Sequence, residues 1–144
     1  MRVIVQRCKY GKVEVDEKVI SEINVGLVLL VGFTHQDSEK EICSMAKKIV
    51  NLRIFDDELG VMNKSILDVG GEILSVSQFT LYGDAKKGNR PSYINALNGK
   101  EAIKLYEKFN EELNKYVRTL PGVFGADMQV YIQNDGPVTI TLEM

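Results

Sequence analysis

The sequence predicts an α+β fold: a single domain, residues 1–144, with a curved, mainly antiparallel, barrel-like sheet and two helices packed outside it. Three observations lead to this prediction. Most segments alternate apolar and polar residues, which is typical of strands. Two segments instead repeat apolar residues at helical spacing. Strands and helices are segregated along the chain, and 144 residues with 44% hydrophobic content suffice for one core.

The N-terminal third predicts a hairpin and a central strand. Residues 2–8 alternate loosely and form the first strand. A second alternating stretch at 13–15 turns at 16–18 into a short further strand, so an early hairpin is expected. The run 25–33 is continuously apolar, as expected for a central strand that is buried on both faces.

Two helices are predicted from their caps and their apolar spacing. Ser38 and Glu41 form a capping box for the first helix, which we place at 38–51. Asn98 caps the second, which is expected to continue until Pro121-Gly122 ends it. Its buried stripe is expected to consist of Ala102, Tyr106, Phe109, Leu113, Val117 and Leu120.

The segments between the helices predict a hairpin, a turn and a strand. Residues 53–62 form a short hairpin whose turn contains Asp56 and Asp57. No further ligands lie at useful spacing, so we interpret these aspartates as turn residues and not as a metal site. Residues 68–71 form another turn, and residues 72–82 are predicted to be one strand.

One polar segment lies within this predicted strand and another directly follows it. Residues 77–80, Ser-Gln-Phe-Thr, are polar for a strand with apolar neighbours, and each buried polar group there needs a partner. Residues 83–92 form a loop with Lys86, Lys87 and Arg90. A functional basic loop and a solvated surface loop look alike in sequence, so both interpretations stay open.

The C-terminal end predicts strands at 128–133 and 138–143 on either side of Asn134-Asp135-Gly136-Pro137. An ordinary hairpin connection is one interpretation of the intervening residues. The other is that the Gly136–Pro137 peptide is a functional element, because an X-Pro bond can be cis at a cost of only about 0.5–1 kcal/mol.

Composition excludes several classes of protein. The net charge of −2 argues against coating nucleic acid through bulk charge. No apolar run approaches the roughly 20 residues of a membrane helix, and the N-terminus turns polar too soon for a signal peptide. Cys8 and Cys43 are expected to be free thiols in a reducing compartment, which predicts a cytoplasmic protein. His35 is the single histidine, and nothing places it beside Ser77 or Thr80.

Two motifs resemble the signatures of a known family. Ser77-Gln78-Phe79-Thr80-Leu81 and Asn134-Asp135-Gly136-Pro137-Val138-Thr139 are similar to the two signature motifs of the D-aminoacyl-tRNA deacylases. Tyr93 stands where phenylalanine is more often expected. The resemblance covers the whole chain and includes, in order, 4–7, 53–55, 60–63, 70–71, 88–92 and 124–130.

The resemblance implies hydrolysis of the ester between a D-amino acid and the 3′ end of tRNA, and removal of glycine from a wrongly charged tRNA. It also implies a homodimer with its active site at the subunit interface and with no metal or organic cofactor. The motif at 77–81 of one subunit would form the pocket with Gly136–Pro137 of the other, whose peptide bond is cis in the family. The carbonyls of Gly136 and Pro137 would then form a gate that rejects L-aminoacyl groups.

The candidate catalytic residues are Ser77, Gln78, Phe79 and Thr80, whose backbone N–H groups and side chains could stabilise an ester oxyanion. Thr80 could be a nucleophile, although no base is committed to it. We favour the competing mechanism, in which the 2′-hydroxyl of the terminal adenosine assists attack by water.

Lys86, Lys87 and Arg90 are the candidate contacts to tRNA phosphates. Two alternatives from other classes are a non-catalytic module that binds tRNA or another partner on the same fold, and an esterase or peptidase that acts on small D-aminoacyl compounds.

Overall fold

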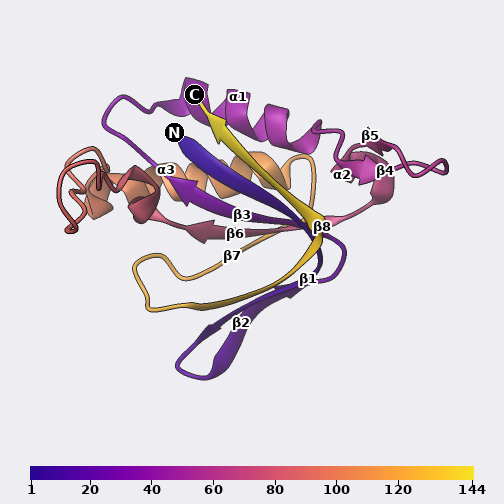
Figure 1. Cartoon of the computed structure of the whole chain (residues 1–144), viewed down its shortest axis with the longest axis horizontal. Coiled ribbons are helices and arrows are strands. Elements are labelled where there is room, and N and C mark those ends of the chain that lie inside the picture. Colours follow the sequence, from indigo (N-terminus) through magenta and orange to yellow (C-terminus); the bar gives the residue numbers. More distant parts are fainter.

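β1 (Arg2–Val15) is the strand that the longest pairings share. The computed structural model describes residues 1–144. One edge of β1 pairs antiparallel with β3 (Gly26–Gly32) and then with β2 (Lys18–Ile23). The other edge pairs antiparallel with β8 (Gln129–Glu143) along almost its whole length, and Figure 1 shows the two strands side by side.

The rest of the sheet is parallel. β3 pairs with β6 (Glu72–Ser77), and β6 pairs with β7 (Thr119–Pro121), which gives the order β2-β1-β3-β6-β7. The sheet curls until its two end strands meet. Ser21 Oγ of β2 donates a hydrogen bond to the Pro121 carbonyl oxygen of β7 at 2.7 Å. The predicted α+β, barrel-like fold is confirmed. The sheet is mixed, with two parallel pairings beside the antiparallel ones.

Two apolar cores stabilise the domain. The larger lies between the sheet and the helices α1 (Glu39–Val50) and α3 (Gly99–Asn114), and Val3 and Val5 of β1 point into it. The smaller fills the inside of the curl and consists of Cys8, Val13, Ile23, Val28, Leu74 and Val76. Figure 1 shows the long helices together on one side of the sheet.

The N-terminal predictions are confirmed, with a longer first strand. β1 continues through the predicted break after residue 8 and ends at the hairpin turn Asp16-Glu17. Both turn residues have positive φ, 49° and 62°, as a two-residue hairpin of this twist requires. β3 is buried on both faces, as predicted.

The first helix matches its prediction, and the second is shorter than predicted. Both halves of the Ser38–Glu41 capping box are present at the start of α1. α3 ends at Asn114, because the Asn114 side chain donates to the carbonyl oxygens of Asn110 and Thr119 and accepts from the Thr119 N–H. The prediction of a helix that reaches Leu120 is wrong, since Leu120 lies in β7.

The predicted short hairpin is present as β4 (Phe55–Asp56) and β5 (Met62–Lys64). Asp57 Oδ1 accepts hydrogen bonds from two backbone N–H groups of the turn. Residues 68–71 are not a simple turn: a short helix, α2 (Ile66–Val69), precedes Gly70, which ends it at φ 63°. Sequence reasoning missed this helix because a single turn has too few residues to show a period.

The predicted strand 72–82 is wrong in its second half. β6 ends at Ser77, and Phe79–Tyr82 form a 3₁₀ helix, η1. The ladder between β3 and β6 ends at the pair Val31–Ser77, so later residues have no strand beside them and bond locally. Accordingly, the Leu81 N–H donates to the Gln78 carbonyl oxygen at 3.3 Å.

Two further segments complete the chain. The predicted loop 83–92 is present and is closed by a two-bond bridge between Asp84 and Ser92. Of the two interpretations of residues 134–137, the hairpin connection is wrong, because residues 129–143 form the single strand β8. None of the helices has the length and apolar character that spanning a bilayer requires.

Candidate functional site

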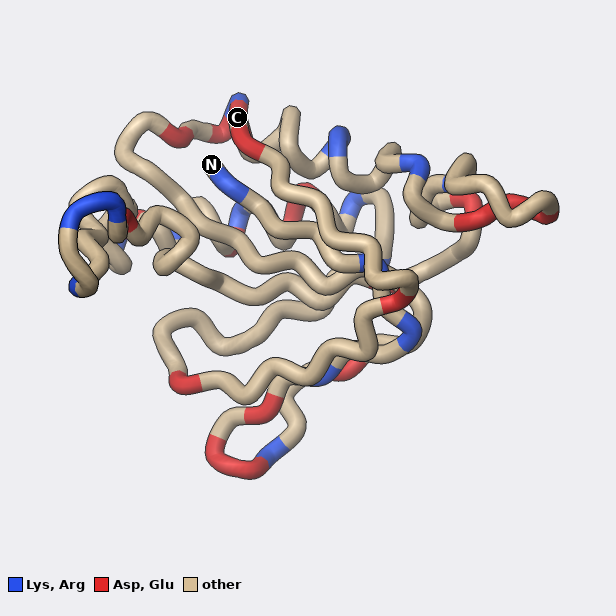
Figure 2. The backbone as a smooth tube through the Cα atoms, viewed as in Figure 1, with Lys and Arg blue, Asp and Glu red and all other residues tan.

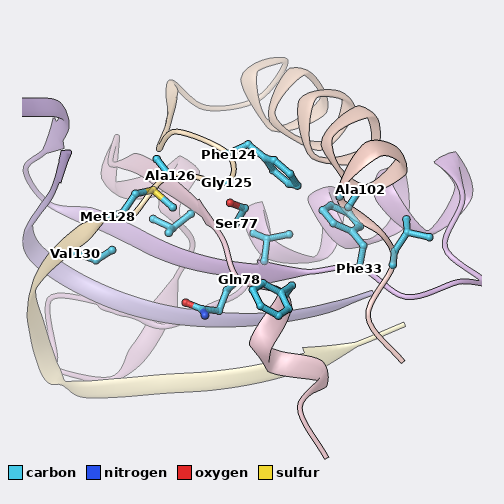
Figure 3. A pocket seen from close by; sticks show the side chains of 14 residues that line it. Phe33, Ser77, Gln78, Ala102, Phe124, Gly125, Ala126, Met128 and Val130 are labelled. Carbon is cyan, nitrogen blue, oxygen red and sulfur yellow. The ribbon is translucent and has the colours of Figure 1, made fainter. Parts of the chain in front are cut away.

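A pocket of about 550 Å³ opens where β6 ends, α3 begins and the chain approaches β8. Its walls are mostly apolar, and Figure 3 shows Ser77 and Gln78 among them. The lining residues are Val31, Phe33, Val76, Ser77, Gln78, Phe79, Leu97, Gly99, Ala102, Phe124, Gly125, Ala126, Met128 and Val130.

Three of the four predicted catalytic residues line this pocket. Ser77 is the last residue of β6, Gln78 caps η1, and Phe79 begins it. Thr80 does not line the pocket, but its hydroxyl accepts a hydrogen bond from Gln78 Nε2. The change from strand to 3₁₀ helix therefore gathers the motif at one edge of the pocket.

The start of η1 supplies unused hydrogen-bond donors. The first 3₁₀-type bond runs from the Leu81 N–H to Gln78, so the N–H groups of Phe79 and Thr80 precede it. Such N–H groups at a helix start have no partner inside the helix. The two adjacent donors can bind a carbonyl oxygen that gains negative charge.

The pocket lining contains no ionisable side chain. His35 lies elsewhere, with Nε2 2.9 Å from the Ile94 carbonyl oxygen. Burial raises the pKa of the Cys8 thiol to about 11, which makes it a poor nucleophile. No group of three or more His, Cys, Asp or Glu side chains is placed to hold a metal ion. The lining therefore supplies polar contacts and N–H donors, and no side chain suited to be a strong base.

Small residues in the pocket wall were not predicted from the sequence. Gly99 and Ala102 come from the first turn of α3, and Gly125 and Ala126 from the loop before β8. A positive φ of 78° at Gly125 turns this loop back toward the pocket. In sequence these residues look like part of a helix cap, of the predicted buried stripe and of a loop, so only the tertiary structure reveals that they line one pocket.

The second motif is a bulge within β8. Along β1 the pairing advances two residues, from Gln6 to Cys8, while along β8 it advances five, from Thr139 back to Asn134. The excess residues of β8 cannot stay in the ladder, so they bow out of it. Gly136 and Pro137 are consequently exposed.

Asn134 fastens the base of this bulge. Its Nδ2 donates to the carbonyl oxygens of Arg7 at 2.9 Å and Val138 at 3.0 Å, so it bridges the strand and the far side of the bulge. Its Oδ1 accepts from the Thr139 hydroxyl at 3.2 Å. The polar residues of the motif are therefore explained by the hydrogen bonds that close the bulge.

Arg7 holds the bulge from beneath. The residue is only 7% exposed. Its Nε lies 3.2 Å from Asp135 Oδ2 and donates to the Asp135 carbonyl oxygen, while Nη1 donates to the Ile54 carbonyl oxygen and to Asp56. One buried guanidinium thus ties β1, the β4 region and the bulge together.

The bulge contributes no residue to the pocket of its own chain. Neither Gly136 nor Pro137 lines the pocket, and the peptide bond between them is cis. Val130 is the last β8 residue in the pocket wall. Gly136 lies six residues further along β8, beyond Asn134 at the base of the bulge.

The predicted tRNA-binding residues lie in the loop 83–92. Lys86, Lys87 and Arg90 are exposed, and none of them forms an ion pair. Lys86 also lines a second hollow of about 420 Å³ with Arg2, Tyr82 and Asn95. The structure therefore leaves all three cations free for an external anion.

Comparisons with known proteins agree along the whole chain. The family model described as D-Tyr-tRNA(Tyr) deacylase matches residues 4–143. A D-aminoacyl-tRNA deacylase of Clostridium botulinum strain Langeland is 57% identical over 144 residues, which cover 99% of this chain and 97% of the relative. A protein of the same name from Anoxybacillus flavithermus is 55% identical and is covered to 99%, as is this chain.

Two solved structures are similar in fold. A structure titled "c-Myc DNA Unwinding Element Binding Protein" superposes with a TM-score of 0.95 at 45% identity and covers 100% of this chain and 99% of its own. A probable eukaryotic D-amino acid tRNA deacylase superposes with a TM-score of 0.85 at 18% identity, over 99% of this chain and 98% of its own. The second likeness concerns the fold alone.

Replacing Arg7 tests whether the buried clamp holds the bulge. Arg7→Met should lower the free energy of unfolding by about 2–4 kcal/mol, because buried acceptors lose a charged donor. Lys9→Met is the control, since Lys9 contacts the same Asp135 at 3.6 Å with a 63% exposed side chain and should change little. The measurement is urea unfolding at one protein concentration, and equal losses in the two variants would contradict the clamp.

Proposed function

Because the chain belongs to the D-aminoacyl-tRNA deacylase family, we propose that it hydrolyses the ester bond between a D-amino acid and the 3′ end of tRNA, including glycyl esters on a non-cognate tRNA. The observation that carries the proposal is the start of η1, where Ser77, Gln78 and Phe79 line the pocket and the N–H groups of Phe79 and Thr80 precede the first 3₁₀ hydrogen bond.

The N–H groups of Phe79 and Thr80 stabilise the charge that the ester carbonyl gains. Water adds to the ester carbonyl carbon, and the carbonyl oxygen becomes an oxyanion. The bond between the carbonyl carbon and the ribose oxygen then breaks, and the ribose oxygen takes up a proton. Preorganised donors at the oxyanion lower the barrier to the first step; removing one such donor from an enzyme typically costs about 10²–10³ in rate.

The 2′-hydroxyl of the terminal ribose assists the attack. The absence of any ionisable side chain from the pocket lining supports this role, because a water nucleophile needs help in losing its proton. The Thr80 hydroxyl is already hydrogen-bonded to the Gln78 amide, which is not a base. Thr80 therefore positions Gln78 and does not attack the ester.

Gly136 and Pro137 of a second copy complete the site. Three observations support this assignment: both residues are exposed, the bulge projects from the ladder, and neither residue lines the pocket of its own chain. A homodimer in which each bulge enters the partner's pocket would use all three.

The proposed gate selects by handedness. When the amine and the carbonyl of the ester are held, D- and L-aminoacyl groups differ only in the side of Cα that bears the side chain. Backbone carbonyls of Gly136 and Pro137 aimed at that side leave room for hydrogen alone. This arrangement accepts any D side chain and also glycine, which has no side chain on either position.

Lys86, Lys87 and Arg90 bind phosphates near the acceptor end. Their exposure and their lack of ion pairs support this role. Since few phosphates would be neutralised, binding should weaken only modestly with salt.

A second candidate function is a nucleic-acid-binding module without catalysis. The solved relative whose title names DNA unwinding element binding favours it, since that protein has almost the same fold at 45% identity. The two candidates differ in one measurable product, the free amino acid.

The purified protein should release D-tyrosine from D-Tyr-tRNA and leave L-Tyr-tRNA intact. The assay follows loss of radiolabelled amino acid from each tRNA at equal enzyme concentration. Binding of both tRNAs without release would support the non-catalytic module. Hydrolysis of D-tyrosine methyl ester in place of the tRNA substrate would support a small-molecule esterase.

Thr80→Ala should keep substantial single-turnover activity, with a loss of about tenfold or less, because it removes one hydrogen bond to Gln78 and no nucleophile. Thr141→Ala, an exposed threonine of β8, is the matched control. A loss in Thr80→Ala as large as that of an inactivated enzyme would return the nucleophile to Thr80.

Gly136→Ala should reduce the preference for D- over L-Tyr-tRNA in a folded dimer. The Cβ would stand 2.9 Å from Val138 Cγ2 and 3.1 Å from Arg7 Nη2, so the bulge or these side chains must shift. Gly60→Ala is the control, since its φ is also positive but nothing lies within 4 Å of its Cβ. An unaltered ratio of the two rates would refute the gate.

A further inference from the structure

An exposed aromatic pair stands at the mouth of the pocket. Phe79 lines the pocket and is nonetheless 57% exposed, and Tyr93 beside it is 41% exposed. Their ring centroids lie 5.1 Å apart in an edge-to-face arrangement. The two rings extend the apolar surface of the pocket out to solvent.

The pair is held in place by the segment that follows it. The Tyr93 ring packs on Gly83, where an added Cβ would approach it to 3.0 Å. Beyond Tyr93, the Thr34 hydroxyl donates to the Asn95 carbonyl oxygen at 2.7 Å, and the Leu97 N–H donates to the Phe33 carbonyl oxygen at 2.9 Å. The two rings are therefore already ordered, and a ligand that binds them causes little further loss of conformational entropy.

The segment that contains Tyr93 is basic. Residues 84–104 contain two acidic residues, Asp84 and Glu101, and five basic ones, so this segment has a net charge of +3 in a chain whose net charge is −2. All five basic residues are exposed, and none forms an ion pair: Lys86, Lys87, Arg90, Lys100 and Lys104.

Acidic residues gather at other parts of the surface. Figure 2 shows them at the β1–β2 turn, which contains Asp16 and Glu17, and at the tip between β4 and β5, which contains Asp57 and Glu58. The loop 83–92 is marked by basic positions in the same view. A polyanion that reaches the pocket is thus favoured on the side of the loop and of the start of α3.

Lys100 and Lys104 continue this basic surface from the pocket edge. Gly99 lines the pocket, Lys100 follows it directly, and Lys104 lies on the same helix face one turn further, about 6 Å along the axis. Lys108, the next in this row, is instead paired with Glu39 of α1. The free cations are therefore confined to the first two turns of α3.

We propose that the aromatic pair and the start of α3 bind the single-stranded 3′ end of the tRNA just upstream of its terminal nucleotide. Tyr93 stacks on the penultimate base, and Lys100 and Lys104 contact phosphates. Aromatic rings set among cations are the usual means of binding single strands, and stacking accepts any base. The proposal rests on the proposed function, since it takes the terminal nucleotide to occupy the pocket.

The aromatic arm is tested with two substrates, D-Tyr-tRNA and 3′-O-D-tyrosyl adenosine, which lacks every upstream nucleotide. Tyr93→Ala should lose at least fivefold more kcat/KM on the tRNA than on the adenosine ester. Tyr93→Phe keeps the ring and should behave as the unmodified protein on both. Tyr116→Ala is the control, because Tyr116 is similarly exposed, 45%, but follows the far end of α3.

The cationic arm is tested by salt dependence. In Lys100→Gln/Lys104→Gln, the slope of log kcat/KM for D-Tyr-tRNA against log salt should become shallower by about 1.4, as expected for two phosphate contacts on a single strand. Lys47→Gln/Lys48→Gln, which removes two exposed and unpaired lysines of α1, should keep the slope of the unmodified protein.

The outcomes separate this proposal from the proposed function. An unmodified protein that hydrolyses neither substrate overturns the proposed function. With activity present, an equal loss on both substrates in Tyr93→Ala overturns the stacking role. A changed sedimentation coefficient of that variant does so too, since it would assign the ring to a contact with a second copy. An identical salt slope in the two lysine pairs overturns the phosphate contacts.

Discussion

The hydrogen-bond register between β1 and β8 is the constraint on which the site depends. β1 supplies both the floor of the larger core, through Val3 and Val5, and the ladder that aligns β8. A one-residue slip in that ladder would turn the apolar side chains of β8 to the wrong face, so the register is fixed by the cores. With the register fixed on both sides, the excess residues between Asn134 and Thr139 can only project.

The pocket lies where strand β6 ends. The pairing of β6 with β3 stops at Val31–Ser77, and the residues that follow form local hydrogen bonds in the 3₁₀ helix η1. This local bonding leaves the N–H groups of Phe79 and Thr80 without partners in the chain. An unpaired N–H group costs free energy when it is buried away from water. Both motifs are therefore places where regular strand pairing stops.

Sequence patterns predicted most of this fold and only part of its site. Caps and periodicity located α1 and β3 because local hydrogen bonds and burial decide them. They failed at residues 79–82, where alternation continues in the sequence but no strand lies beside the chain, and they did not show that residues 134–137 are a bulge within one strand. Small wall residues such as Ala102 and Gly125 have no local signature, since their role is to leave space. The motifs themselves were recognised by resemblance, while their geometry required the fold.

Because the bulge does not line the pocket of its own chain, mixed populations of subunits have a predictable behaviour. Under the proposed pairing, each chain contributes halves of two different sites. A chain with a ruined pocket and a chain with a ruined bulge would each be inactive alone, yet a pair formed from one of each would contain one site built wholly from sound parts. Two inactive variants, one altered at Ser77 and one at Gly136, should therefore restore activity when they form mixed dimers, with at most half the normal number of sites per dimer.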